Sequence, residues 1–223
     1  MHGTWKVGWM GLGLLVLLPA ALFARSSEAI GQEKVLGKAA VAVHAAPTAK
    51  PARTIDNLQA AYDGESNAQA KYAAFAKQAE KEGYLKVAKL FTAVAMSEGL
   101  HAAKHANVIK AMGAIPKTTL STPKVGTTQE NLAAGLKGEN AEIETMYPEF
   151  IKQAEAEKNS QASMSFLGAK NVEAVHAKLF SEALANLETW KAVGDFYVCQ
   201  VCGNVVAQLD FQYCPICKAP VQV

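Results

Sequence analysis

The sequence predicts an all-α protein: a four-helix bundle with one long crossover, followed by a small C-terminal metal-knuckle module. Three observations support this prediction. Apolar residues recur at helical spacing over residues 54–192. One connection within that run, residues 113–129, holds two prolines and several threonines, whereas the other two connections are short. All four cysteines lie within the last 25 residues, outside the helical pattern.

Residues 1–29 are expected to be a signal peptide. After Lys6, residues 7–24 carry no charge, Arg25 follows, and the small residues that end at Ala29 suit cleavage. An uncleaved membrane anchor stays open as an alternative, because the apolar run approaches the length of a membrane span. The sequence therefore predicts an exported, periplasmic protein, or one anchored at the membrane by this segment. Residues 30–53, rich in Ala, Lys and Pro, are expected to be a flexible linker.

Four helices are expected at about residues 54–82, 84–112, 129–157 and 161–191. Gly83 is a natural stop for the first helix. Two short loops and one long crossover are the connectivity of a ferritin-like bundle. The formal net charge is +2 and no basic face stands out, so no nucleic-acid partner is expected. Residues 195–223, short and punctuated by glycine and proline, are expected to form the separate cysteine-bearing module.

The bundle sequence contains an internal repeat. FAKQAE at residues 75–80 matches FIKQAE at 150–155, an offset of 75 that also relates Glu98 to Glu173. Glu65 and Glu139 are related by an offset of only 74. The second copy therefore carries one extra residue between Glu139 and Phe150. Helices commonly absorb such an insertion as a π-bulge, and we expect one near Met146 to Pro148.

Each half of the repeat supplies one lone glutamate and one Glu-x-x-His pair. Residues three apart share a helix face, so each carboxylate and imidazole point the same way. The complete set, with one further glutamate a turn beyond the second lone one, is Glu65, Glu98, His101, Glu139, Glu142, Glu173 and His176. A lone Glu-x-x-His is commonly a surface ion pair or a cap, but two copies at one repeat offset argue against that interpretation.

The neighbours of these residues are apolar, which places the carboxylates on inward stripes of the bundle. Burying five carboxylates together is prohibitive without compensating cations. Two divalent metals would compensate most of that charge. Oxygen-rich ligation with one histidine per metal suits iron or manganese better than zinc. The sequence therefore predicts a two-metal site held by the seven residues.

Three further side chains are candidates for a supporting role. Tyr72 and Tyr147 each follow a lone glutamate by about two turns, where they would donate hydrogen bonds to ligand carboxylates or pack in the core. His105 lies one turn beyond His101, and a hydrogen-bonding or surface role is favoured over metal ligation.

The four cysteines form two C-x2-C knuckles separated by eleven residues: Cys199, Cys202, Cys214 and Cys217. Gly203 and Pro215 permit the tight turns that direct four thiolates at one tetrahedral ion. Disulfides are a poor alternative, because each pair is too close in sequence for easy bridging. The tail alone leaves a zinc ribbon and a single sulfur-ligated iron open. Beside a two-iron bundle, iron is favoured, because such a bundle needs electrons one at a time.

Residues 54–223 resemble rubrerythrin, a ferritin-like di-iron domain followed by a rubredoxin-like module. The resemblance rests on GES, SEGLH, GENAEIETMYPEF, VEAVH and the paired knuckles. It implies reduction of hydrogen peroxide to water, two non-haem irons in the bundle and one iron in the four-cysteine site. It also implies that one iron exchanges a histidine ligand for Glu142, and that homodimers place the tail of one subunit beside the bundle of the other.

The tail departs from the family pattern. FYVC lacks the tryptophan often found before the first knuckle, and Asn204 and Val205 replace the usual aromatic residue after CG. These changes bear on redox potential more than on fold. The signal peptide leaves the electron donor unknown, because the usual cytoplasmic reductants would not reach an exported protein. A ferritin-like iron-oxidising protein and a zinc-stabilised scaffold remain as alternatives.

Overall fold

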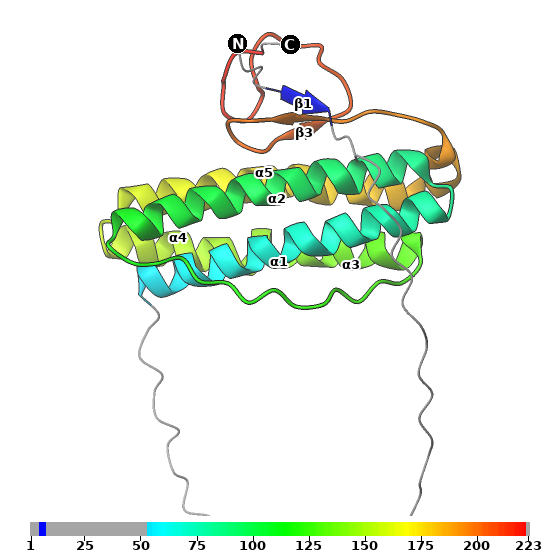
Figure 1. Cartoon of the computed structure of the whole chain (residues 1–223). Coiled ribbons are helices and arrows are strands. Elements are labelled where there is room, and N and C mark those ends of the chain that lie inside the picture. The colour runs from blue at the N-terminus through cyan, green and yellow to red at the C-terminus, as the bar shows by residue number, and fades with distance from the viewer. Residues whose placement is uncertain (1–4, 8–52, 222–223) are drawn as a thin grey trace, which may run out of the picture. The chain divides into compact units, whose positions relative to one another are not determined.

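The computed structural model describes residues 5–7 and 53–221. Two helical hairpins form the bundle (Figure 1). The first consists of α1 (Thr54–Lys81) and α2 (Leu85–Ala111). The second consists of α3 (Thr128–Ala141), a π-helix (Glu142–Met146), α4 (Tyr147–Ala156) and α5 (Ser160–Ala185). The predicted ferritin-like four-helix bundle with one long crossover is confirmed.

The two hairpin turns share one geometry. Gly83 has φ of +82° and Lys158 has φ of +57°, so both occupy the left-handed conformation that commonly ends a helix. The amide of the next residue then bonds back to the helix, from Tyr84 to Ala79 at 2.9 Å and from Asn159 to Ala154 at 2.8 Å. Glycine adopts this conformation without strain, whereas the lysine bears a steric cost.

The crossover between α2 and α3 runs along α1 (Figure 1). Three polar side chains of α1 hold it: Gln59 bonds Ile115 and Lys117, Asp63 bonds Thr118 and Thr119, and Asn67 bonds Thr119 and Ser121. A long connection without secondary structure is thereby fixed to the surface of the bundle.

The predicted helical insertion between Glu139 and Phe150 is confirmed as a π-helix at Glu142–Met146. It begins a few residues earlier than the expected Met146 to Pro148. Tyr147 and Pro148 open the following α-helix instead. The extra residue is thus absorbed upstream of the proline.

The core of the bundle consists of two apolar clusters at different heights. One contains Tyr72, Phe91 and Phe180, and the other contains Leu58, Tyr147 and Phe166, with small alanines in both. Along each long helix, the regular spacing of the repeat places Glu or His between residues of the two clusters. The ionisable groups therefore form a buried polar layer between two apolar layers.

The fourth helix is shorter than expected. It ends at Ala185 rather than near 191, and a 3-10 helix, Leu187–Lys191, follows it. Asn186 leaves helical geometry with φ of −129° and ψ of 30°. In the sequence, Trp190 continues the apolar period of the helix. In the structure Trp190 is buried outside that helix, where its ring stacks on Phe196 of the following segment, with centroids 5.9 Å apart.

The C-terminal module contains a small antiparallel sheet of order β1-β2-β3. β2 (Tyr197–Cys199) pairs with β3 (Val205–Val206) on one side and with β1 (Trp5–Val7) on the other. β1 belongs to the expected signal peptide; the rest of residues 1–29 and the linker to residue 52 lie outside the described residues. Within the described ranges, no helix has both the length and the apolar character required to cross a membrane.

Candidate metal centres

The polar layer of the bundle gathers six of the seven predicted ligands into two overlapping groups. Both groups share Glu98 and Glu173, one from each Glu-x-x-His pair. In each group, the potential ligand atoms lie within 4.8 Å of one another. The members are Glu65, Glu98, His101 and Glu173 for the first, and Glu98, Glu139, Glu173 and His176 for the second. Two shared carboxylates between two four-residue groups are the arrangement of a bridged two-metal site.

The imidazoles face inward at matching positions. His101 Nδ1 lies 2.8 Å from Glu173 Oε1 and 3.2 Å from Glu98 Oε2. His176 Nδ1 lies 2.7 Å from Glu173 Oε2 and 3.5 Å from Glu98 Oε1. The two rings are 6.2 Å apart between centroids. Each Nδ1 therefore points into the space that the carboxylate oxygens surround.

The oxygen and nitrogen atoms of this layer that could bind a metal are buried and lack hydrogen-bond partners. They include Glu65 Oε2, Glu98 Oε2, His101 Nδ1, Glu139 Oε2, both carboxylate oxygens of Glu173, and His176 Nδ1. Leaving one buried polar atom unsatisfied costs about 1–3 kcal/mol, so a cluster of this size requires a ligand. Oxygen donors with one imidazole for each group fit two iron ions. The residues present therefore fit the metals that the sequence predicted.

The electrostatics of the layer lead to the same requirement. Burial, and then repulsion from Glu98, raises the pKa of Glu65 well above its usual range and that of Glu139 to about 7. Burial and the charge of Glu139 likewise raise the pKa of Glu142. Although burial opposes protonation of His176, the carboxylate of Glu173 raises its pKa. Negative charge is in excess, which favours cations.

Glu142 differs from the other six predicted ligands. It lies on the π-helix, remains partly exposed, and belongs to neither four-residue group. Its carboxylate interacts electrostatically with Glu139, Glu173 and Glu98, so it lies beside the layer. The second repeat thus places an additional carboxylate, at the first residue of the π-helix, on one side of an otherwise symmetric site.

The two buried tyrosines each donate to a lone glutamate. The Tyr72 hydroxyl donates to Glu139 Oε1, and the Tyr147 hydroxyl donates to Glu65 Oε1. Each bond joins one half of the repeat to the other half. The sequence predicted donation to carboxylates but did not indicate this exchange of partners.

His105 belongs to neither ligand group. It is fully buried, with Nε2 lying 3.2 Å from Tyr147 Oη and Nδ1 lying 2.9 Å from Ser165 Oγ. Sequence reasoning did not single out Ser165. A signal was present in the repeat, since His105 and Ser165 correspond to the apolar residues Phe180 and Leu90 at the offset of 75.

The four predicted thiol ligands converge in the C-terminal module. Cys199 Sγ lies 3.8 Å from Cys217 Sγ, and Cys202 Sγ lies 3.6 Å from Cys214 Sγ. All four cysteines are free, and all four sulfurs lie within 4.8 Å of one another. A hydrogen bond with Cys202 lowers the pKa of Cys199 to about 5, which favours the thiolate. Four sulfurs this close together fit iron or zinc.

Asn204 lies against this sulfur cluster. Its backbone amide donates to Cys202 Sγ at 3.4 Å, and its side-chain amide donates to Cys214 Sγ at 3.8 Å. Asn204 is buried. Its side chain therefore adds an N–H donor directed at a cysteine sulfur.

The sulfur cluster and the carboxylate layer are connected through one hydrogen bond. His101 Nε2 lies 3.0 Å from the carbonyl oxygen of Cys202. Gly203 makes this approach possible: its φ is +91°, and a Cβ there would lie 2.8 Å from His101 Nε2 and closer still to Ser97 Oγ. Cys202 thus contributes its thiol to the sulfur cluster and contacts an imidazole of the carboxylate layer through its carbonyl oxygen, within a single chain.

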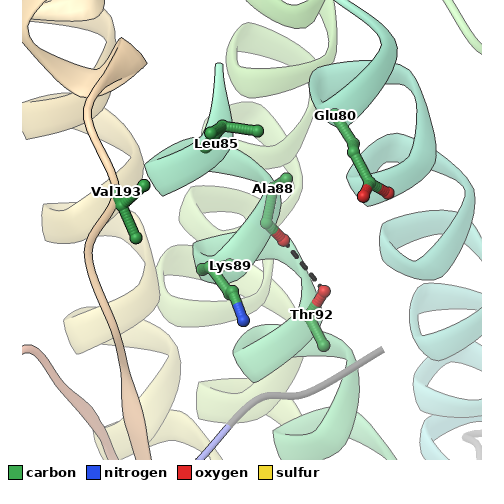
Figure 2. A pocket seen from close by; sticks show the side chains of 6 residues that line it. All are labelled: Glu80, Leu85, Ala88, Lys89, Thr92 and Val193. Carbon is green, nitrogen blue, oxygen red and sulfur yellow. Dashed lines mark hydrogen bonds between the residues drawn. The ribbon is translucent and has the colours of Figure 1, made fainter. Parts of the chain in front are cut away.

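A separate pocket lies away from both centres. Figure 2 shows it at the α1–α2 turn and the segment before β2, with Glu80, Leu85, Ala88, Lys89, Thr92 and Val193 around it. Its volume is about 150 Å³, and none of the predicted metal ligands lines it. The ion pair between Lys89 and Asp195, 4.0 Å apart, connects α2 to the segment that leads into the module.

A four-helix bundle that surrounds a buried carboxylate and imidazole layer, joined to a four-cysteine module, defines a ferritin-like di-iron protein with a rubredoxin-like domain. A model of the rubrerythrin family matches residues 56–184. The chain belongs to the rubrerythrin family.

Known relatives cover most of the chain. Nigerythrin of Nitratidesulfovibrio vulgaris is 39% identical over 170 residues, which are 75% of this chain and 83% of nigerythrin. Rubrerythrin-2 of Clostridium acetobutylicum is 35% identical over 172 residues, covering 75% of this chain and 93% of that protein.

Solved structures agree with the sequence relationship. The fully reduced, all-ferrous state of nigerythrin superimposes with a TM-score of 0.72 at 36% identity, over 80% of this chain and 88% of that one. The bacterioferritin of Desulfovibrio desulfuricans shares the fold alone, with a TM-score of 0.56 at 22% identity over 61% of this chain and 80% of that one.

Proposed function

We propose that this protein is a non-haem di-iron peroxidase, which reduces hydrogen peroxide to water with electrons that enter through iron in the four-cysteine module. The observation that carries this proposal is the hydrogen bond between His101 Nε2 and the Cys202 carbonyl oxygen. A storage protein has no need for a sulfur-ligated centre against a bundle imidazole. An electron-consuming reaction in the bundle does need one.

The proposed ligands divide between the two centres. Glu65, Glu98, Glu139, Glu173, His101 and His176 would hold the two bundle irons, with Glu142 as the exchangeable ligand, and Cys199, Cys202, Cys214 and Cys217 would hold the third iron. When bound, ferrous ions would supply the two electrons that the reduction of peroxide requires. The same four thiolates accept zinc, and a zinc-loaded module would not transfer electrons.

The chain itself supplies orientation and exclusion of water. Tyr72 and Tyr147 hold one oxygen each of Glu139 and Glu65, which leaves the other oxygen directed into the layer. The apolar clusters above and below keep the layer buried, so the interactions of its charges are stronger than in water.

Glu142 would account for a ligand exchange. His101 is bonded to the module on one side and faces the carboxylates on the other, so its position is constrained. The Glu142 carboxylate, on a π-helix at the margin of the layer, is free to enter or leave the set. We propose that, when iron is bound, the Glu142 carboxylate rather than the His101 ring would move as one iron exchanges a histidine ligand for this carboxylate.

We propose that the protein acts outside the cytoplasm, with an electron donor of that compartment. Residues 1–29 would deliver it either as a cleaved signal, whose removal would also remove β1 from the sheet, or as a membrane anchor. We also propose a homodimer. An exchange of four-cysteine modules between subunits would preserve the His101–Cys202 contact, because the same surfaces would meet.

The test is anaerobic reduction of iron-loaded protein, with metals counted beforehand, followed by rapid mixing with hydrogen peroxide. Oxidation of both iron chromophores with stoichiometric loss of peroxide is expected. A Cys214→Ser/Cys217→Ser variant should oxidise its bundle iron once but fail to be reduced again through the module. Peroxide that leaves both chromophores reduced would contradict the proposal. A hollow assembly that accumulates iron would support ferritin-like iron oxidation and storage instead.

A further inference from the structure

His105 is a buried histidine that the metal centres do not use. It is completely shielded from solvent, and the aromatic rings of Tyr147 and Phe166 lie at centroid distances of 6.1 and 5.5 Å. Both of its ring nitrogens have hydrogen-bond partners: Nε2 with Tyr147 Oη at 3.2 Å and Nδ1 with Ser165 Oγ at 2.9 Å. Tyr147 in turn donates to Glu65. A continuous chain of four side chains therefore reaches the carboxylate layer.

The direction of every hydrogen bond in this series of four side chains follows from the innermost bond, between Tyr147 and Glu65. The Tyr147 proton is directed at the Glu65 carboxylate, so its hydroxyl oxygen accepts from His105 Nε2–H. A neutral imidazole that carries its proton on Nε2 has a bare Nδ1, which accepts from the Ser165 hydroxyl. All three donors therefore point inward, from Ser165 toward Glu65.

The outer end of the chain reaches a surface groove. Ser165, which is half-buried, lines a groove of about 460 Å³ together with Lys104, Asn107 and Gln161. Water in this groove can exchange protons with the Ser165 hydroxyl. The path therefore begins at solvent and ends at a carboxylate of the bundle centre.

The internal repeat indicates that packing alone does not require this path. At the repeat offset of 75, Phe180 corresponds to His105 and Leu90 corresponds to Ser165. Both are fully buried, and the Phe180 ring lies 5.3 Å from Tyr72 as the counterpart of the His105–Tyr147 contact. The same scaffold is thus satisfied by apolar residues in one half, whereas the other half holds a hydrogen-bonded chain.

We propose that Ser165, His105 and Tyr147 form a proton path from the groove to the bundle centre. This inference rests on the proposed function, because reduction of one peroxide to two waters consumes two protons along with two electrons. In each transfer, solvent protonates Ser165 Oγ, which gives its own proton to His105 Nδ1. His105 Nε2–H passes to Tyr147 Oη, and the Tyr147 proton passes to Glu65 or to the reactant beside it.

The balance of one transfer is one proton in at Ser165 and one proton out at Tyr147. The imidazole ends with its proton on Nδ1, and rotation of the ring out of its two hydrogen bonds, with exchange of that proton, restores the first tautomer before the next transfer without reversing the step. Burial, and then the charges of His101 and Lys104, lowers the pKa of His105 to about 3, which keeps the ring neutral and able to accept and donate at once.

Three substitutions separate proton transfer from packing. His105→Phe reproduces the residue of the other half, and His105→Gln retains a donor and an acceptor but passes protons poorly. Ser165→Ala removes the outer hydroxyl, and Ser163→Ala is the matched control on the same helix. In single-turnover oxidation by peroxide, both His105 variants should slow the reaction roughly tenfold or more, less than the 10²–10⁴-fold typical of direct acid catalysis. The solvent deuterium isotope effect should increase, while iron content stays unchanged.

A second readout does not depend on peroxidase activity. In full-length protein labelled with ¹⁵N-histidine and loaded with zinc, His105 should be the Nε2–H tautomer. Ser165→Ala should slow the solvent exchange of that proton by about tenfold, whereas Ser163→Ala should leave it unchanged. The Nδ1–H tautomer, or exchange that is indifferent to Ser165, would overturn the path even if peroxide is consumed. The predicted tautomer and exchange in a protein that does not consume peroxide would retain the path and reject the proposed function.

Discussion

Glu82, in the turn between α1 and α2, accepts hydrogen bonds from both the amide and the hydroxyl of Thr128, at 2.7 and 2.5 Å. Thr128 is the first residue of α3. The equivalent glutamate of the second hairpin, Glu157, accepts from the amide of Thr54, the first residue of α1, at 3.2 Å. Each hairpin turn therefore caps the first helix of the other hairpin.

Glu82→Ala should reduce the free energy of unfolding by about 1 kcal/mol at neutral pH, the usual cost of a lost cap. The hydrogen bonds from Thr128 lower the pKa of Glu82. The contribution is therefore complete above the unfolded pKa and is lost as pH falls through the lower folded pKa. Urea titrations of both proteins should converge in acid. Exposed Glu80→Ala is the control, and a difference that persists at low pH would contradict the cap.

Gly203→Ala should separate the module from the bundle. The added Cβ would strain a φ of +91° and lie 2.8 Å from His101 Nε2, so the His101–Cys202 bond would lengthen or break. A cost of about 1–3 kcal/mol in stability is expected from such strain. With both centres filled, electron transfer from the module to the bundle should slow in stopped-flow traces. Gly168→Ala, which meets nothing within 4 Å, should leave the transfer rate unchanged.

Tyr72→Phe and Tyr147→Phe should each weaken iron binding in the bundle. Each removes the hydroxyl that holds a lone glutamate, and loss of such a support typically costs about 10–100-fold in metal affinity. Anaerobic Fe(II) titration measures the effect. Only Tyr147→Phe should also raise the solvent isotope effect of peroxide reduction, because only that tyrosine contacts His105. Equal isotope effects in the two variants would contradict this distinction.

Asn204→Val should lower the reduction potential of the iron-loaded module. The side-chain amide directed at Cys214 Sγ stabilises the reduced, more negative centre, and valine removes that donor. A redox titration followed by the absorbance of the module measures the change in reduction potential. A potential that rises or stays constant would exclude Asn204 as a determinant.

Lys158→Gly should stabilise the fold, by up to about 1 kcal/mol. Lys158 has φ of +57° at the end of α4, where glycine avoids the steric cost of the left-handed conformation. The reciprocal change Gly83→Lys should destabilise the first hairpin. Thermal unfolding of the two variants should shift in opposite directions, and shifts of the same sign would contradict the strain.

The repeat offset makes several features predictable from the sequence alone. Residues one offset apart face the same way in equivalent helices, so the paired Glu-x-x-His motifs indicate one shared layer. The 74-residue offset between Glu65 and Glu139 likewise requires a local insertion, and the π-helix supplies it. Such predictions succeed because helical phase depends only on sequence separation.

Other features depend on how the two halves meet. The tyrosines donate across the repeat. This pairing requires the placement of α1 relative to α3 and α4, which sequence spacing does not contain. The apolar period predicts a fourth helix that is too long, because Trp190 continues the period in the sequence but packs on Phe196 in the structure. Spacing relates His105 to His101, whereas its hydrogen-bond partners, Tyr147 and Ser165, come from the other hairpin.

The crossover is fixed to α1 by polar side chains, its Ala114 packs against one apolar cluster, and none of the residues of the ionisable layer belongs to it. Noncovalent contacts join the two hairpins: each hairpin caps a helix of the other through a glutamate, and each donates a tyrosine hydrogen bond to a glutamate of the other. A polypeptide cut between residues 113 and 126 would therefore yield two fragments that each keep a complete hairpin. Mixed together, these fragments should reassemble as a split protein whose iron site forms only on complementation.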